Sequence, residues 1–258
     1  MLDLPPPLLE LDRVAFEVPG KYIVRNVSLS LYPAEIVCVV GGSGAGKSTL
    51  LRIAAGLRPP SAGQLLVRRP GGEITAFHSL PEHLQPAFRR RHFGFVAQNA
   101  RDTLDMAQSA AANIAMPLFE NGGRNFGRAF QSARHWFDAL QLDESRMNER
   151  PEMFSGGMQQ RLQIAKALVH RPDVLFLDEP TTGLDTSAQA KLLTLLLEIQ
   201  CRTGVAMLLV THDLRIARLL AHRIVVVHDG EIVEEAPPDR LVADPQHAAA
   251  RDLMSAMI

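Results

Sequence analysis

Short, nearly continuous apolar runs alternate with segments of helical periodicity over much of this chain. The run EIVCVV at 35–40 ends at glycines, which is typical of a strand buried on both faces. Three later runs have the same character, namely DVLFLD at 173–178, VAMLLV at 205–210 and RIVVVH at 223–228. Helical patterns separate the first of these three from the second, and the second from the third. The alternation predicts a mostly parallel sheet with helices on both faces.

Two regions depart from this alternation. Near the N-terminus, LLELDRVAFEV (8–18) and YIVRNVSLSL (22–31) flank the turn PGK, and their pattern predicts a pair of antiparallel strands. Residues 99–170 are rich in alanine, have helical periodicity and lack β-branched runs. This second region is therefore expected to be an inserted helical subdomain.

Composition narrows the class of protein. A hydrophobic content of 47% with 5% aromatic residues indicates a soluble globular chain. The formal net charge of −1 gives no reason to expect a nucleic-acid partner. Cys38 and Cys201 stand far apart in apolar runs, which favours a reduced compartment. The first residues lack the pattern of a signal peptide, and no apolar run approaches the roughly 20 residues that span a bilayer.

The stretch GGSGAGKST at 41–49 satisfies the pattern G-x-x-x-x-G-K-[ST]. It follows a predicted buried strand and opens a helical segment from Lys47 to Gly56, which is the context that the pattern requires. Backbone N–H groups would wrap the phosphates of a nucleotide at the helix N-terminus, and Lys47 would reach the terminal phosphates. The phosphate-binding residues that we expect are Gly41, Gly42, Ser43, Gly44, Ala45, Gly46, Lys47, Ser48 and Thr49. We call residues 41–49 the phosphate loop.

Two adjacent carboxylates end the later run DVLFLDEP. Asp178 stands at the carboxyl end of a predicted buried strand, where open parallel sheets bind their ligands. With the Ser48 hydroxyl, its carboxylate would help to hold Mg²⁺. Glu179 would polarise the attacking water or accept its proton. On their own, the two acids are equally compatible with an ordinary strand end that faces solvent.

A second glycine-rich stretch, FSGGMQQR at 154–161, resembles another phosphate cradle. Ser155, Gly156 and Gly157 would open a helix over about 156–170, with its positive end toward an anion. Considered alone, SGG is better explained as a helix N-cap with flexible neighbours. The sequence around it decides between these interpretations.

Taken together, these motifs resemble the nucleotide-binding subunit of the ATP-binding cassette (ABC) family over nearly the whole chain. FSGGM is similar to that family's signature, which is usually LSGGQ. Gln98, after FGFVA, matches the glutamine loop, and Asp185 in TGLD matches the D-loop. His212 in LLVTHD matches the switch histidine. Several ordered motifs at the expected spacing are far more specific than any one of them.

The resemblance implies a fold, an activity and cofactors. The fold is α/β, with a P-loop NTPase core, an N-terminal antiparallel β part and the inserted helical subdomain, all in one cassette domain. The activity is ATP hydrolysis with Mg²⁺. The implied domain limits are 1–258 for the cassette, 1–98 and 171–258 for the nucleotide-binding core, and 99–170 for the subdomain that carries the signature. The implied catalytic residues are Glu179, His212 and Gln98, and the metal site is formed by Ser48, Gln98 and Asp178.

The resemblance also explains the second cradle. Cassettes of this family pack head to tail in pairs, so Ser155, Gly156, Gly157 and Met158 would contact the nucleotide of a partner cassette, which is the same or a related chain. The signature departs from the usual one at Phe154 and Met158. A third departure is Val18, at the position that usually carries an adenine-stacking aromatic; Phe16 or Tyr22 would supply a ring if the hairpin is shifted.

Three functions remain open at this stage. The first is a transport ATPase on the inner face of a cell membrane, bound to a permease through the helical subdomain. The second is an ATPase of a soluble complex for phosphonate breakdown, since FSGGMQQRLQIAKAL resembles both peptide or nickel importers and the carbon–phosphorus lyase cassettes. Importer ATPases commonly continue beyond a tail such as ADPQHAAARDLMSAMI, which favours the second. The third, a repair or translation cassette, lacks support because the chain has neither a coiled-coil insertion nor a charged linker.

Overall fold

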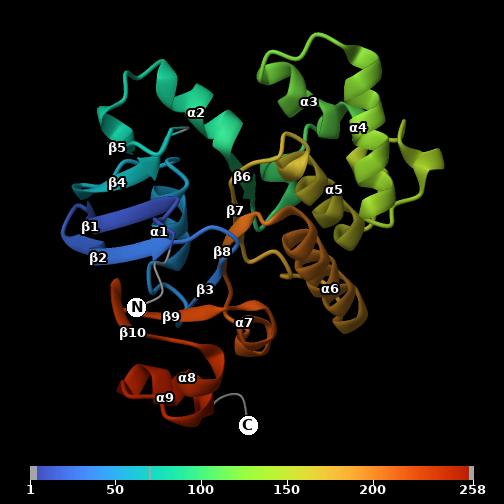
Figure 1. Cartoon of the computed structure of the whole chain (residues 1–258). Helices are drawn as coiled ribbons and strands as arrows, with labels where there is room; N and C mark the ends of the chain where they lie inside the picture. The colour runs from blue at the N-terminus through green and yellow to red at the C-terminus, as the bar shows by residue number, and fades with distance from the viewer. Residues whose placement is uncertain (1–4, 70, 256–258) are drawn as a thin grey trace.

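A computed structural model describes residues 5–69 and 71–255, which form two β-sheets with helices around them (Figure 1). The N-terminal segment 1–4 and the last three residues of the tail lie outside the described residues. The smaller sheet is antiparallel and has the strand order β2-β1-β4-β5. Its strands are β1 (Leu9–Val18), β2 (Lys21–Leu31), β4 (Ala62–Arg68) and β5 (Ile74–Ala76). The predicted hairpin is confirmed, because β1 and β2 pair on either side of the Pro19–Gly20 turn.

The larger sheet has the strand order β10-β9-β3-β8-β7-β6. Neighbouring strands from β9 to β6 are parallel, and only β10 pairs in the antiparallel direction among the described strands of this sheet. The mostly parallel sheet predicted from the apolar runs is therefore confirmed. Its strands are β3 (Ile36–Val40), β6 (Phe93–Val96), β7 (Val174–Asp178), β8 (Ala206–Val210), β9 (Arg223–His228) and β10 (Glu231–Ala236).

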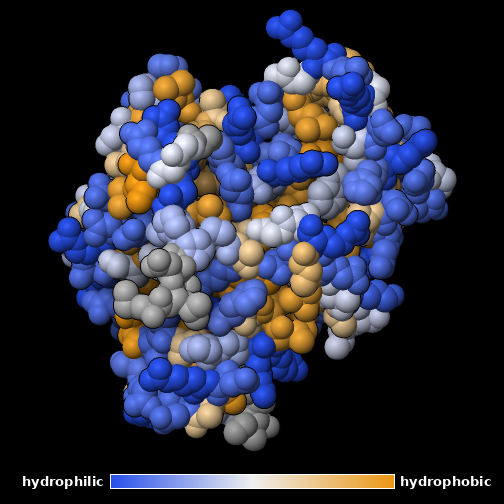
Figure 2. Space-filling model, in the orientation of Figure 1, coloured by the Kyte–Doolittle hydropathy of each residue, from blue (hydrophilic) through white to orange (hydrophobic). Residues whose placement is uncertain are grey.

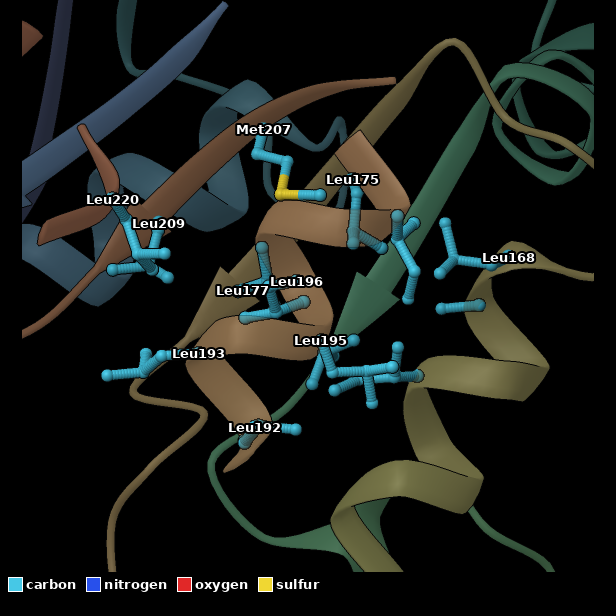
Figure 3. Close-up of a cluster of buried hydrophobic side chains, with 14 of the residues drawn as sticks. Leu168, Leu175, Leu177, Leu192, Leu193, Leu195, Leu196, Met207, Leu209 and Leu220 are labelled. Carbon is cyan, nitrogen blue, oxygen red and sulfur yellow. The ribbon is translucent and has the colours of Figure 1, made fainter. Parts of the chain in front are cut away.

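Helices cover both faces of the larger sheet, which explains why β3, β7 and β8 are buried throughout. Alternate side chains of a strand point to opposite faces, so Leu175 and Leu177 join one apolar cluster while Val174 and Phe176 join another. The first cluster packs against leucines of α6 and α7 (Figure 3). The second packs against α1 and the smaller sheet. These helices are α1 (Lys47–Ala54), α6 (Thr186–Thr203) and α7 (Leu214–Leu220).

The segment 99–170 forms a separate group of helices beside β6 (Figure 1). It contains α3 (Ala110–Glu120), α4 (Phe126–Ala139) and α5 (Gly156–Leu168), with 3₁₀ turns between them. The remaining helices are α2 (Leu84–His92), α8 (Pro238–Ala243) and α9 (Ala248–Ser255). None of the helices within residues 5–69 and 71–255 has the length and apolarity required to cross a membrane.

The contact between β6 and α5 positions the helical group against the sheet. Gly94 of β6 lies so close to α5 that a side chain there would overlap the carbonyl oxygen of Ala167 and touch Leu175. The absence of a side chain at Gly94 therefore sets how closely α5 approaches β6. Gln98 lies two residues after the end of β6, and the FSGGM stretch opens α5. The contact therefore also sets how Gln98 and the FSGGM stretch are placed relative to each other.

We expect Gly94→Ala to destabilise the fold by about 1–3 kcal/mol, the usual cost of overpacking a filled interior. Urea denaturation of the purified chain would measure the loss. Gly127→Ala is the matched control, because Gly127 lies exposed in the first turn of α4 and alanine favours helix. Equal stability of the two variants would show that α5 can move away from β6 without cost.

Candidate functional site

The phosphate loop connects β3 to α1 and is fixed by close backbone contacts. Gly41 and Gly46 have positive φ angles of 155° and 100°. A side chain at Gly41 would overlap the carbonyl oxygen of Val227, and one at Gly46 would overlap that of Ile23. Glycine is therefore required at both positions. The loop packs against β9 on one side and β2 on the other.

Lys47 begins α1 and folds back over the loop that precedes it. Its ammonium group donates hydrogen bonds to the carbonyl oxygens of Gly41, at 2.9 Å, and Gly42, at 2.8 Å. The side chain is buried, and this burial lowers the pKa of Lys47, while the charges of Glu179 and Asp178 act in the opposite direction. A buried ammonium aimed into a glycine-rich loop is suited to binding an anion.

A hydrogen bond joins the phosphate loop to β7. The hydroxyl of Ser48 donates to Oδ1 of Asp178 at 2.7 Å, and that carboxylate is only 2% exposed. Arg52 of α1 places a nitrogen 3.8 Å from the other carboxylate oxygen. A hydroxyl and a carboxylate side by side are hard oxygen donors of the kind that Mg²⁺ prefers, so the residues present fit this ion. No pattern in the sequence pointed to Arg52 as a residue of this site.

Glu179 follows β7 and is the meeting point of three other side chains. Its Oε2 accepts hydrogen bonds from Gln98 Nε2 at 3.3 Å and from the Thr182 hydroxyl at 3.0 Å. Nδ1 of His212 lies 3.2 Å from the same oxygen, a hydrogen bond when that nitrogen carries the proton. The structure thus brings together the three residues that the sequence motifs single out as catalytic. Thr182 was not predicted, although a hydroxyl three residues after the glutamate in a turn is a usable signal.

The backbone at Glu179 is unusual. Its φ angle is 46°, in the left-handed region that a residue with a side chain seldom adopts. The N–H group of Glu179 nevertheless donates to the carbonyl oxygen of Val210 at the end of β8, at 2.9 Å. Neighbouring structure therefore holds the strained conformation, and such strain is typical of functional sites. The Glu179 carboxylate lies just beyond the end of β7, within reach of Gln98 and His212.

The signature loop, residues 154–158, lies at the start of α5. Ser155 is the N-cap of this helix, and its hydroxyl accepts a long hydrogen bond of 3.4 Å from the N–H of Met158. Gly156 is open on its outer side, with no atom within 4 Å of the place where a side chain would begin. Within the described residues, no hydrogen bond joins the signature loop to the phosphate loop. Ser155 and Gly156 are both exposed at the start of α5.

Asp185 lies beside the signature loop. Its carboxylate caps α6 by accepting a hydrogen bond from the N–H of Ala188 at 2.8 Å. A side chain at Gly157 would come within 3.6 Å of Leu184 and of Ala188, so the D-loop and the signature loop pack together. α5 runs from Gly156 to Leu168, two residues shorter at its end than the predicted helix.

The hairpin next to the phosphate loop bears two aromatic rings and an exposed valine. Val18, at the turn, is 40% exposed. The ring of Phe16 is partly buried under the guanidinium of Arg58, which lies 4.8 Å from the ring centroid. Tyr22 is half exposed and is the residue before Ile23, whose carbonyl oxygen contacts Gly46. A guanidinium, that of Arg25, also lies 5.7 Å from the Tyr22 ring centroid, and Tyr22 is the more exposed of the two rings.

Comparison with known proteins gives consistent results. The family model described as ABC transporter matches residues 24–182. The chain is 38% identical over 253 residues to the putative phosphonates utilization ATP-binding protein PhnK of Escherichia coli (strain K12), covering 98% of each chain. It is 36% identical to the methionine import ATP-binding protein MetN 2 of Burkholderia pseudomallei (strain K96243), covering 95% of this chain but only 62% of that relative's length.

Solved structures show the same fold. The ATP-binding cassette MJ0796, solved as a dimer in a post-hydrolysis state with ADP and Pi, superposes with a TM-score of 0.79. It is 30% identical in sequence, and the match covers 89% of this chain and 98% of that one. The geometry of the phosphate loop, the carboxylates of Asp178 and Glu179 at the carboxyl end of β7, and the match to a cassette solved after hydrolysis all agree with the family model. This chain therefore belongs to the ABC transporter family, and it is an ATPase.

Proposed function

We propose that this chain is the ATP-binding and ATP-hydrolysing subunit of an ABC transport assembly, in which two cassettes close on ATP and drive a partner permease. The observation that carries the proposal is the cluster around Glu179 at the carboxyl end of β7. Gln98, Thr182 and His212 all reach one oxygen of this carboxylate. A working position on the inner face of a membrane, reached through the permease, belongs to the same proposal.

The residues of the site have complementary roles in this proposal. Lys47 exchanges its carbonyl partners for the β- and γ-phosphates of ATP. Ser48 and Asp178, with Gln98, would hold Mg²⁺, which when bound would neutralise charge on the phosphates. Glu179 orients the attacking water and accepts its proton, while His212 contacts the γ-phosphate or that water. The hydrogen bonds of Gln98 and Thr182 to Glu179 fix the position of the carboxylate.

A partner cassette completes the site in this proposal. The N-terminus of α5 carries the exposed Ser155 and Gly156, whose N–H groups would receive the γ-phosphate bound to the second subunit. Dimerisation driven by ATP would follow, because each nucleotide is contacted by both chains. The dimeric state of MJ0796 with ADP and Pi supports this arrangement for the family fold.

A second candidate setting is phosphonate use through a soluble enzyme complex. The specific observation in its favour is the similarity to PhnK, a putative phosphonates utilization protein, which is 38% identical over 253 residues. The ATPase chemistry is the same in both settings, and the partner distinguishes them.

A cavity between α2 and the α3–α4 turn is the surface that we propose for the partner. The volume of this cavity is about 800 Å³. Arginines of α2 and of the α3–α4 region line it, together with Glu120. The hollow between α2 and the α3–α4 region is visible at the top of Figure 2. The arginines are Arg90 and Arg91 of α2, Arg124 of the turn and Arg128 of α4. Their excess of positive charge favours a partner segment that carries carboxylates.

The first prediction concerns the carboxylate that contacts three side chains. Glu179→Gln keeps the shape of the side chain and removes the proton acceptor, so turnover should fall by about 10²–10⁴-fold. ATP binding should be retained, because the phosphate loop is unchanged. Steady-state phosphate release and equilibrium titration with a labelled ATP analogue would measure the two quantities. Turnover within threefold of the unmodified protein would remove Glu179 from the role of general base.

The second prediction tests the two-cassette arrangement. Gly156→Asp adds a side chain and a negative charge where a γ-phosphate must approach, so steric overlap and Coulomb repulsion both oppose closure. In a Glu179→Gln background, light scattering with ATP should show a dimer, and adding Gly156→Asp should return the protein to monomer. The affinity of the monomer for ATP should not change. A double variant that still dimerises would place the signature loop outside the interface.

The third prediction identifies the partner. The tagged chain, isolated from its native cell, should retain a polytopic permease in the transport setting or a soluble enzyme in the phosphonate setting. Deletion of the gene should prevent growth on a phosphonate as sole phosphorus source only in the second. The double substitution Arg91→Glu and Arg124→Glu should release either partner and leave the basal ATPase rate unchanged. Retention of the partner would assign its binding to another surface.

A further inference from the structure

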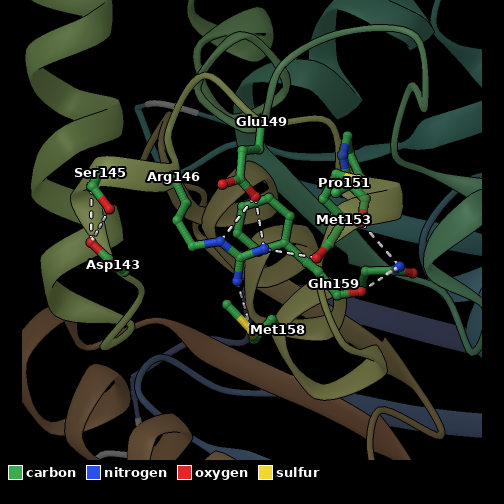
Figure 4. Close-up of polar contacts among 9 residues, drawn as sticks. Asp143, Ser145, Arg146, Glu149, Pro151, Met153, Met158 and Gln159 are labelled. Atoms are coloured by element: carbon green, nitrogen blue, oxygen red, sulfur yellow. Dashed lines mark hydrogen bonds and ion pairs between the residues drawn. The ribbon is translucent and has the colours of Figure 1, made fainter.

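The two departures of the signature loop from the family pattern share one contact. Phe154 stands where leucine is usual, and Met158 where glutamine is usual. The guanidinium of Arg146 lies 4.4 Å from the centroid of the Phe154 ring, and its Nη1 is 3.6 Å from the sulfur of Met158 (Figure 4). A single side chain therefore contacts both ends of the signature loop.

Arg146 is itself held in place by hydrogen bonds. Its Nε and Nη2 both donate to Oε2 of Glu149, at 2.9 and 2.7 Å. Nη2 also donates to the carbonyl oxygen of Met153 at 2.7 Å, directly before the signature loop. Only 27% of the Arg146 side chain is exposed, compared with 68% of Arg134, which forms an ion pair with Glu144 nearby. The planar guanidinium thus uses its donors at one edge and its face against an aromatic ring.

Gln159 also holds the backbone segment that Arg146 contacts. Nε2 of Gln159 donates to the carbonyl oxygens of Pro151 and Phe154, each at 3.0 Å. The ring of Phe154 is only 4% exposed. By contrast, Gly156 has no neighbour within 4 Å on its side-chain side, and the Ser155 cap is a long hydrogen bond. The side chains and open faces that would meet a phosphate thus have few contacts of their own, whereas the residues before them are closely held.

We propose that Arg146 is a positioning residue that holds the signature loop in the shape needed to receive the γ-phosphate of a partner cassette. The inference rests on the proposed function, in which Ser155 and Gly156 serve the partner's nucleotide. Arg146 acts by fixing the carbonyl of Met153, the ring of Phe154 and the thioether of Met158 together, so the N–H groups at the start of α5 are aimed before closure. Preorganised donors of this kind bind an anion without a cost of reordering.

Lysine cannot replace arginine in this arrangement. Its ammonium would pair with Glu149, but it has no flat face for the Phe154 ring and cannot direct donors to Glu149 and Met153 in one plane. The proposal therefore differs from that of a surface ion pair, in which only the positive charge matters. It also differs from a role in stability alone, in which every property of the chain would decline together.

The test uses the full chain in the Glu179→Gln background, where ATP traps the dimer. Arg146→Ala and Arg146→Lys are compared with Arg134→Ala, the matched control. We expect both Arg146 variants to raise the ATP concentration for half-maximal dimerisation by about tenfold or more, as for the loss of a charged hydrogen bond. The ATP affinity of the monomer should not change, because the phosphate loop is not altered. Arg134→Ala should behave as the background protein does.

Three results would overturn the proposal. Unchanged dimerisation by Arg146→Ala would remove the role, and full recovery by Arg146→Lys would reduce it to charge. Equal losses of monomer ATP affinity and dimerisation would indicate a general structural role. If Arg146→Ala does not fold, the result for Arg146→Lys alone decides whether the proposal stands. Gly156→Asp separates this inference from the proposed function. If Gly156→Asp prevents dimerisation and the Arg146 variants do not, only the inference fails; if Gly156→Asp still dimerises, both fail.

Discussion

The hydrogen bond between Ser48 and Asp178 joins two segments that are 130 residues apart in sequence. It fixes the start of α1 to the end of β7, and hence the phosphate loop to the carboxylates. This contact is possible because β3 and β7 both pair with β8, so parallel strands deliver their carboxyl ends to one edge. Glu179 follows Asp178 directly, so its position beside the phosphate loop depends on the same contact.

The elements that rest on continuous patterns could be predicted from the sequence. The buried strands, the hairpin and α1 follow from apolar runs and glycine stops, and the parallel direction of the buried strands follows from the helices between them. The order of the strands in the sheet was not predicted. The phosphate loop could also be predicted, because its glycine pattern is specific. The structure gives the reason for two of these glycines, since side chains at Gly41 and Gly46 would overlap the backbone of Val227 and Ile23. The family resemblance identified Gln98, Glu179 and His212 as catalytic candidates, and the three side chains meet in the structure.

Other parts had no local signal. Arg146 is one arginine among many in a polar stretch, and its importance arises only when the 3₁₀ turn places it over Phe154. Thr182 and Arg52 likewise gain their roles from the tertiary fold. The left-handed residue Glu179 also forms a hydrogen bond to Val210 at the end of β8, a contact between distant segments. Sequence patterns report local geometry and burial, whereas such contacts depend on the assembled sheet.

The position of the signature loop has a consequence for how hydrolysis depends on concentration. Under the proposed function, each chain carries half of two different sites, so a subunit without a partner holds ATP but lacks the groups that complete its hydrolysis. Where chains are too dilute to pair, ATP would then be bound without being consumed. As pairing sets in, the rate of hydrolysis would rise more steeply than the concentration of the chain.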